Sequence, residues 1–279
     1  MSPILDPNRE FINKWEMYKL LLRHSIKNVQ IPVTKLFSRE SLSSMLIEYP
    51  LLYIKPIASW GGKDISTIKK NENSFVWTIQ GQEAVITHDF NEIYHQMNKF
   101  YKDKSTIIQR GIPTIKFDDR PFDIRSHLYK EMDGSWTYAG DLVRIGGMGS
   151  IVSNIEISNG SVKPTDEVIS TVLPDPNHQL STDRLKTVSK EICQMLDQYH
   201  FFMEVGLDFA LDHNGNLWII EVNTDDTQGG PDLYLFSLLP DQSAFDKIIQ
   251  NKAKVYDKWM KHMIESFEAS LTEKGKEPD

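Results

Sequence analysis

The chain has 279 residues, of which 40% are hydrophobic, and its formal net charge at pH 7 is −8. This length is enough to bury a substantial core and leaves room for two lobes or domains. The acidic balance argues against a nucleic-acid-binding protein, because such proteins normally present a basic surface.

A single cysteine, Cys193, cannot form an internal disulfide and suits a reducing compartment. No apolar run approaches the length of a membrane span, and the N-terminus has no signal-peptide pattern. These features predict a soluble cytoplasmic protein that has neither a membrane nor a nucleic acid as its partner.

The first part of the chain predicts a helical segment followed by a small lobe. Apolar residues recur at helical spacing through residues 9–24, so residues 1–29 are expected to be an N-terminal helical segment. Residues 30–108 are expected to form a small α+β lobe. Its expected elements are a helix after Ser38, a buried strand over 51–55, strands near 75–79 and 83–87, a helix from Asp89, and a strand over 106–110.

Residues 109–279 predict a larger lobe. Alternation over 122–130 places four polar side chains on one face of a strand, namely Asp123, Arg125, His127 and Tyr129. The other expected elements are a strand over 136–144, a polar surface loop or lid over 160–180, a helix over 182–199, and a long C-terminal helix over 241–271. The apolar face of that last helix predicts packing on its own core or, in a homo-oligomer, on a partner subunit.

The segment 203–223 reads as a hairpin. Its Asn214-Gly215 pair is a strong hairpin signal, because both residue types tolerate the positive φ of a type I′ turn. Closing a two-residue turn pairs His213 with Asn216. Counting back along the two strands then places Asp208 directly opposite Glu221.

Facing carboxylates destabilise a sheet unless something compensates their charge. Asn223 shares the face of Glu221, since strand side chains alternate. Hard divalent cations bind carboxylate and amide oxygens. The hairpin therefore predicts a metal site formed by Asp208, Glu221 and Asn223. The alternative is a pair of solvent-facing carboxylates that repel each other weakly.

Two further features suit an anionic ligand. Lys55 ends a buried strand just before Gly61-Gly62, where a fixed charge and close backbone approach favour phosphate. Arg125 and Arg144 lie on strands expected to be neighbours, and arginines on strand faces bind phosphate or carboxylate. The alternatives are an ordinary lysine before a surface turn, and arginines that pair with Asp123 or Asp141.

The order of these motifs resembles that of the ATP-grasp superfamily, and most closely its YheC/YheD-type branch, found in spore-forming bacteria. The resemblance runs from about Phe11 to Asn223. Its most specific pieces are RPFDIR at 120–125, RIGGMGSIVSN at 144–154, and Asp208 with the later EVN at 221–223. It implies a two-lobed α+β fold with a nucleotide cleft between a small α+β lobe and a larger antiparallel-sheet lobe.

The resemblance also implies ATP and Mg²⁺ as cofactors and a role for each matching position. The nucleotide-binding positions are Lys14, Lys55, the lid glycines Gly61 and Gly62, and the adenine hinge Gln109, Arg110 and Ile112. The groups that face the γ-phosphate or an acylphosphate are Arg125, Arg144 and Asn154. The magnesium ligands are Asp208, Glu221 and Asn223.

The activity implied is that of an ATP-dependent ligase that forms an amide or peptide bond through an acylphosphate. Its substrates would be small-molecule or peptide carboxylates and amines. Two alternatives stay open. One is a non-catalytic, spore-associated structural or interaction protein, and the other is an ATP-dependent small-molecule kinase.

Three departures from the family pattern are visible. Only about ten residues precede the Lys14 segment, so most of the N-terminal domain common in the superfamily is expected to be missing. Asp64 stands where relatives tend to have glycine, and would repel phosphate unless it is turned away or paired with Lys63. After Asn223, Asp225 and Asp226 are expected either to bind an amine substrate or to belong to a polar loop that caps a helix.

Overall fold

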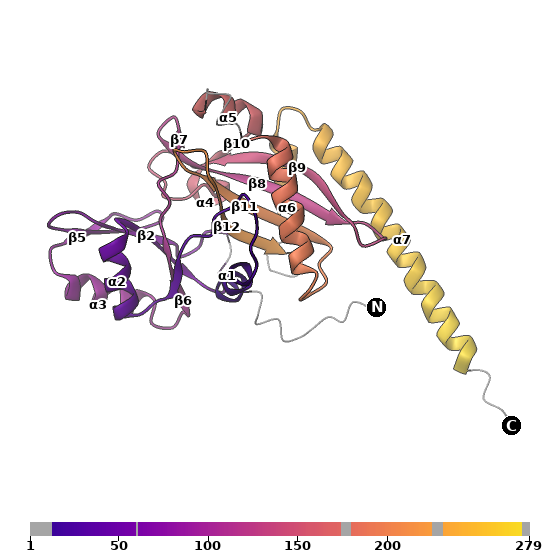
Figure 1. Ribbon diagram of the computed structural model, residues 1–279, viewed down its shortest axis with the longest axis horizontal. Coiled ribbons are helices and arrows are strands. Elements are labelled where there is room, and N and C mark those ends of the chain that lie inside the picture. The colour runs from indigo at the N-terminus through magenta and orange to yellow at the C-terminus, as the bar shows by residue number, and fades with distance from the viewer. Residues whose placement is uncertain (1–12, 60, 174–179, 225–230, 275–279) are drawn as a thin grey trace.

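Two sheets, each covered by helices, form the two halves of the molecule (Figure 1). The computed structural model describes residues 13–59, 61–173, 180–224 and 231–274, with only the backbone described beyond 265. Both sheets are antiparallel throughout, which confirms the expected α+β class.

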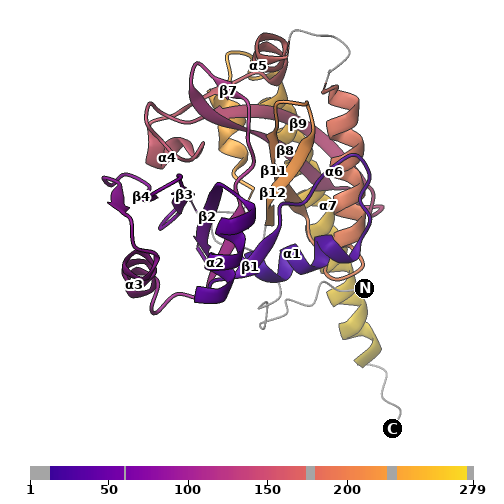
Figure 2. The ribbon, with the colours of Figure 1, turned by 60° about the vertical axis from the view of Figure 1, so that its left-hand side comes forward.

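The small-lobe sheet has the strand order β1-β6-β2-β3-β4-β5. Its strands are β1 (Thr34–Leu36), β2 (Leu51–Pro56), β3 (Ser66–Lys70), β4 (Phe75–Ile79), β5 (Val85–Thr87) and β6 (Thr106–Arg110). The helices α2 (Arg39–Glu48) and α3 (Phe90–Phe100) lie together on one face, as Figure 2 shows. Leu52 and Ile54 pack in the core that both helices share. Since strand side chains alternate, Tyr53 and Lys55 point to the opposite face.

The large-lobe sheet has the order β10-β9-β8-β11-β12, with β7 paired to β8. Its strands are β7 (Lys116–Phe117), β8 (Arg120–Lys130), β9 (Trp136–Ile145), β10 (Ser161–Lys163), β11 (Glu204–Leu211) and β12 (Leu217–Thr224). Three helices contribute to the core on one face: α1 (Lys14–Arg23), α5 (Thr165–Val172) and α6 (Thr182–Leu196). Buried Cys193 belongs to this core. The opposite face carries Asp123, Arg125 and Arg144.

The structure differs from the expected elements at β3 and over segment 160–180. The strand β3 was not expected, because its sequence STIKK has only one large apolar residue. Segment 160–180 was expected to be a loop or lid, but it contains β10 and α5, and Val168 and Ile169 of α5 are buried in the core. The strand β6 runs to Arg110, so the chain leaves the small-lobe sheet after that residue. The borders at 29 and 108 stay predictions.

The hairpin β11–β12 has a three-residue turn in place of the expected two-residue turn. Asp212, not His213, pairs with Asn216, and Gly215 takes the positive φ of 74°. The cause is the buried Asp212 carboxylate, which accepts hydrogen bonds from the backbone N–H groups of Asn214 and Asn216, both at 2.9 Å. Such a side-chain turn fixes the loop geometry.

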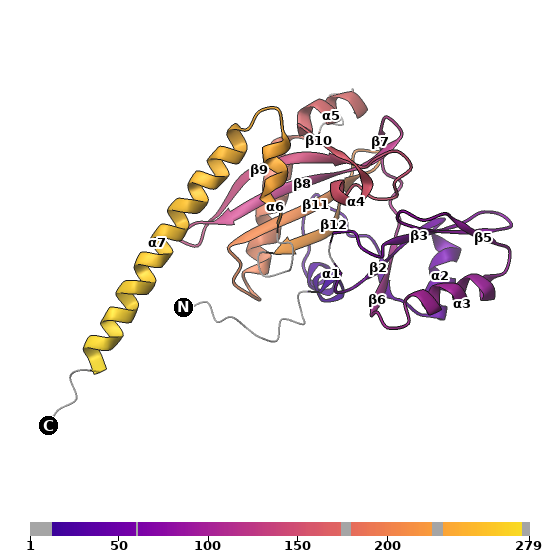
Figure 3. The ribbon, with the colours of Figure 1, turned by 180° about the vertical axis from the view of Figure 1, so that it is seen from behind.

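The C-terminal helix α7 (Ser243–Lys274) extends beyond the rest of the molecule (Figures 1 and 3). Trp259 packs edge-to-face on Phe201, whereas Met260 and Met263 are more than half exposed. A homo-oligomer through this helix stays a prediction. A short 3₁₀ helix, η3 (Leu233–Leu238), precedes α7, and α4 (Ile155–Ser158) follows β9. Among the described helices, none is both long and apolar enough to cross a lipid bilayer.

The core around α6 provides a stability test. Ile192 of α6 is 0% exposed, whereas Ile47 of α2 is 76% exposed. We expect Ile192→Ala to lower the free energy of unfolding by about 2–5 kcal/mol, through lost burial and a residual cavity. The matched helical control, Ile47→Ala, should change it by no more than about 0.5 kcal/mol. Denaturant titration measures both, and equal losses would contradict the packing described here.

Candidate active site

A cavity of about 430 Å³ lies between the two lobes and is lined by residues of both. It brings together twelve of the thirteen predicted site residues: Lys55, Gly61, Gly62, Gln109, Arg110, Ile112, Arg125, Arg144, Asn154, Asp208, Glu221 and Asn223. The thirteenth, Lys14, is not among the lining residues, but its Nζ is 3.0 Å from Glu221 Oε1. Residues that are far apart in the sequence thus meet at one place.

A β-bulge puts Glu221 into this cavity. At the turn, Leu211 pairs with Leu217, and the same register continues to Phe209 opposite Ile219. The register then shifts by one residue at Ile220, so Asp208 faces Glu221, as expected. Ile220 and Glu221 consequently both line the cavity, although strict alternation would turn Glu221 toward the core.

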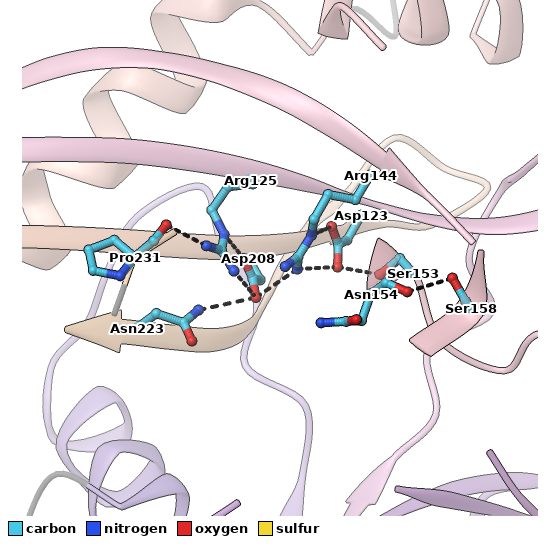
Figure 4. A network of polar contacts seen from close by, with 9 residues as sticks. All are labelled: Asp123, Arg125, Arg144, Ser153, Asn154, Ser158, Asp208, Asn223 and Pro231. Carbon is cyan, nitrogen blue, oxygen red and sulfur yellow. Dashed lines mark hydrogen bonds and ion pairs between the residues drawn. The ribbon is translucent and has the colours of Figure 1, made fainter. Parts of the chain in front are cut away.

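Asp208 is the centre of the polar network in Figure 4. Its side chain is 3% exposed and forms a bidentate ion pair with Arg125, in which Nη2 and Oδ2 are 3.1 Å apart. Nη2 of Arg144 lies 2.8 Å from the same Oδ2, and Nδ2 of Asn223 donates to it at 3.2 Å. Both carboxylate oxygens therefore already have cationic partners.

The protonation states follow from these contacts. Burial by itself raises the pKa of Asp208, but the charges of Arg125 and Arg144 outweigh it and hold this pKa at about 2. Burial alone would lower the pKa of Arg144, and Asp123 and Asp208 raise it instead. Asp208 and Arg144 are therefore both ionised at neutral pH, because each buried charge has an opposite charge beside it.

The alternative expected for the arginines is correct for Arg144, which pairs with Asp123. The guanidinium donates through Nε to Oδ1 at 2.7 Å and through Nη2 to Oδ2 at 2.6 Å. Ser153 also donates to Asp123. Arg125 pairs with Asp208 rather than with either expected aspartate, and its Nη1 donates to the carbonyl oxygen of Pro231 at 2.7 Å.

Two lysines approach the cluster, Lys55 from β2 of the small lobe and Lys14 from the start of α1. Lys55 is buried, and its Nζ donates to Gln109 Oε1 at 2.7 Å. Burial lowers its pKa, an effect that Glu221 opposes. Lys14 pairs with Glu221 and donates to the carbonyl of Ser59. Burial raises the pKa of Glu221, and so does Asp208, but Lys14 and Lys55 together outweigh both, so the net shift is downward.

The side chains of Asp208, Glu221 and Asn223 carry oxygen atoms, the donor type that binds a magnesium ion. Two carboxylates on facing strand positions and a neighbouring amide provide the hard oxygen ligands that Mg²⁺ takes. Within the described ranges, no group of three or more His, Cys, Asp or Glu side chains gathers as a metal-binding cluster would. The expected magnesium ligands, Asp208, Glu221 and Asn223, include only two side chains of these four types. The lack of a cluster of three therefore does not contradict this set.

An apolar compartment lies at the hinge. Ile112, Ala210 and Trp218 pack together, with Ile220 against them. The Arg110 guanidinium lies 5.0 Å from the centroid of Trp218 and 5.1 Å from that of Tyr49. The N–H of Arg110 donates to the carbonyl of Val33 within the small lobe.

The loop that contains Gly61 and Gly62 has left-handed backbone at three positions. Gly61, Gly62 and Asp64 have φ values of 64°, 74° and 59°. Asp64 thus occupies a conformation that favours glycine, and aspartate is among the few other residues that tolerate it. Of the two expected possibilities, its carboxylate takes the first: it turns away from the cavity and pairs with Lys104 at 2.9 Å, rather than with Lys63. The expected aspartates Asp225 and Asp226 lie outside the described residues.

Gln80 spans the cleft, and nothing local in the sequence pointed to it. From the end of β4, its Oε1 accepts from the backbone N–H of Ile151 at 3.1 Å and from Ser150 Oγ at 3.2 Å. Its Nε2 donates to the carbonyl of Ile157 at 3.4 Å. Tyr53 of β2 reaches the same segment, because its hydroxyl donates to the Ile151 carbonyl at 3.2 Å.

Gln80 therefore holds the segment that contains Asn154 against the small lobe. The Asn154 side chain caps α4, since Oδ1 accepts from the N–H of Ile157 at 3.2 Å. Its amide nitrogen points toward the Asp208 cluster in Figure 4. The small lobe, the α4 cap and the charged cluster are thus joined through a chain of contacts.

We expect Gln80→Ala to speed hydrogen exchange at the Ile151 amide, because the acceptor of that N–H is removed. An increase of at least roughly fivefold corresponds to the loss of one hydrogen bond of about 1 kcal/mol. The control is Gln82→Ala, an exposed glutamine two residues later. Exchange measured by mass spectrometry or NMR checks this, and unchanged exchange at Ile151 in Gln80→Ala would contradict the bridge.

Comparison with known proteins identifies relatives for this arrangement. A family model described as "YheC/D like ATP-grasp" matches residues 4–232. The chain is 26% identical over 230 residues to "Endospore coat-associated protein YheD" of Bacillus subtilis (strain 168), which covers 78% of this chain and 49% of the relative. It is also 26% identical over 231 residues to "Endospore coat-associated protein YheC" of the same organism, covering 78% of this chain and 62% of the relative. The chain thus spans about half to three-fifths of these curated relatives.

Proposed function

Because the chain belongs to the YheC/D-like ATP-grasp family, we propose that it is an ATP-dependent ligase that joins a carboxylate to an amine. The observation that supports this best is the buried Asp208 cluster, which places two arginines, an asparagine and a facing glutamate at one wall of an interlobe cavity. Such a wall suits a ligand that carries several negative charges.

The nucleotide would bind with adenine in the compartment of Ile112, Ala210 and Ile220, and with its phosphates toward Lys55 and Arg144. The cavity lining itself is close to neutral. It contains four basic residues (Lys55, Arg110, Arg125, Arg144) and five acidic ones (Asp123, Glu156, Asp208, Glu221, Asp232). A polyphosphate entering such a cavity needs added cations, which is the reason to expect Mg²⁺ with the nucleotide.

Asp208, Glu221 and Asn223 would hold Mg²⁺, which when bound neutralises charge on the phosphate oxygens. The two carboxylates have cationic partners already, so Asp208 is ionised and oriented by its arginines, and Glu221 is oriented by Lys14. Arg125 and Arg144 can exchange a carboxylate oxygen for a phosphate oxygen without losing a charge-assisted hydrogen bond. The wall is therefore prepared for an anionic reactant.

In the proposed reaction a substrate carboxylate oxygen attacks the γ-phosphorus, and the bond to the ADP oxygen breaks. The acylphosphate formed is then attacked at its carbonyl carbon by an amine that has lost a proton. Phosphate leaves with the bonding electron pair, and an amide remains. Positioning and charge neutralisation supply most of the acceleration in such transfers. Contacts such as those of Gln80 and Tyr53 with Ile151 would hold the lobes closed. Closure would exclude water, which hydrolyses the intermediate.

We expect Glu221→Gln and Asp208→Asn to raise the Mg²⁺ concentration needed for half-maximal ADP and phosphate release by at least roughly tenfold, since each removes an anionic ligand. Glu221→Gln is the cleaner variant, because its side chain is 29% exposed and less dependent on buried partners. Asp133→Asn in an exposed turn is the control. Turnover and Mg²⁺ dependence like those of the unmodified protein in both variants would refute the metal assignment.

We expect Lys55→Met to weaken Mg-ATP binding by roughly 10- to 100-fold, because a buried ammonium next to phosphate is replaced by an apolar group. The control is Lys69→Met, an exposed lysine on the neighbouring strand β3. Calorimetry measures both affinities. An unchanged affinity in Lys55→Met would remove Lys55 from the nucleotide site.

A spore-associated structural role is a second candidate, favoured by the names of the two relatives, both described as endospore coat-associated. If the unmodified protein bound no Mg-ATP at any Mg²⁺ concentration, the structural role would be the only one of these candidates to remain. A small-molecule kinase would instead release ADP without free phosphate, so phosphate detection separates it from a ligase.

A further inference from the structure

The cavity wall formed by α4 and η3 differs in chemistry from the strand wall. The lining residues contributed by α4, by η3 and by the residue that precedes η3 are Ile155, Glu156, Asp232, Tyr234, Leu235 and Leu238. None of these six is basic, whereas Lys55, Arg125 and Arg144 line the strand wall. The bases of the strand wall are matched there by Asp123, Asp208 and Glu221, so that wall is close to neutral. The α4–η3 wall is apolar and carries acids without a base among these six residues.

The apolar part of this wall is anchored in a packed cluster. Ile155 of α4 and Leu235 of η3 pack in the cluster around Phe236, which fixes the two elements against each other. Tyr234 and Leu238 of η3 are nevertheless 64% and 44% exposed, although both line the cavity. Large apolar side chains that stay exposed beside a cavity are typical of a ligand contact.

The acidic part flanks this apolar patch from both elements. Glu156 lies in the first turn of α4, and Asp232 is the residue before η3; both are exposed. Two carboxylates here repel a phosphate or a carboxylate and attract a cation. A carboxylate substrate is therefore better placed at Arg125 and Arg144, and the acidic wall is left for the other substrate.

We propose that the α4–η3 wall binds the amine substrate, and that it selects a primary ammonium group carried next to an aliphatic or aromatic group, as at the amino end of an apolar amino acid or peptide. This rests on the ligase function proposed above. Asp232 and Glu156 recognise the charge, and Tyr234 and Leu238 contact the apolar group. The wall proposed for the nucleophile thus differs from the strand wall in carrying acids that no basic residue of that wall matches.

The test uses four small probes and no nucleotide, so it is independent of turnover. L-leucinamide has the ammonium and the apolar side chain, N-acetyl-L-leucinamide lacks the charge, and glycinamide lacks the side chain. N-acetyl-L-leucine lacks the ammonium and has a carboxylate in place of the carboxamide. NMR titration of the full chain gives their relative affinities. We expect L-leucinamide to bind at least roughly tenfold more tightly than N-acetyl-L-leucinamide, as befits charge-assisted hydrogen bonds, and more tightly than the other two.

In the double variant Asp232→Asn/Glu156→Gln the preference for L-leucinamide over its acetylated form should fall below roughly threefold. The matched control Asp103→Asn/Glu72→Gln changes two exposed acids of the small lobe and should retain the preference. Leu238→Ser should reduce the difference in affinity between L-leucinamide and glycinamide.

Three results would overturn the proposal: equal affinities for L-leucinamide and N-acetyl-L-leucinamide, tighter binding of the carboxylate probe, or an unchanged preference for L-leucinamide in the double variant. Mg-ATP calorimetry on the same samples reports separately on the ligase function.

Discussion

The buried ion-pair network around Asp208 is the constraint on which the rest of this structure depends. Moving a carboxylate and two guanidinium groups out of water costs several kcal/mol per ion unless their partners are placed well. Arg125, Arg144 and Asn223 supply that compensation, and Asp123 compensates the second arginine in turn. The strands β8, β9, β11 and β12 must therefore keep one register for all of these charges to be paired at once.

The bulge at Ile220 shows how this register is maintained. The turn at Asp212 sets a pairing that would place Ile220 opposite Asp208 and turn Glu221 into the apolar core. One extra residue in β12 corrects the offset and returns Glu221 to the polar face. The expected Asp208–Glu221 pair is thus confirmed although the expected turn is wrong, because the three-residue turn and the bulge offset each other.

The cavity combines features that belong together in the proposed reaction. Its strand wall holds fixed cations and ionised carboxylates, its hinge compartment is apolar, and Gln80 and Tyr53 tie the small lobe to the segment leading to α4. Preorganised charges in a partly closed cleft are what an anionic transition state needs. The acidic, apolar α4–η3 wall would give the same cleft a place for a cationic reactant, as proposed above.

Periodicity and residue chemistry in the sequence determined the α+β class, most helices and strands, and the identity of the polar residues, because alternation along a strand and helical spacing are local properties. They could not reveal β3, with its single large apolar residue, or the helix α5, which is stabilised by burial against the large sheet. Only the tertiary structure decided which carboxylate each arginine pairs with, that Asp64 turns to Lys104, and that Gln80 spans the cleft. These contacts join residues far apart in the sequence, so they depend on how the two sheets are placed, which no local pattern encodes.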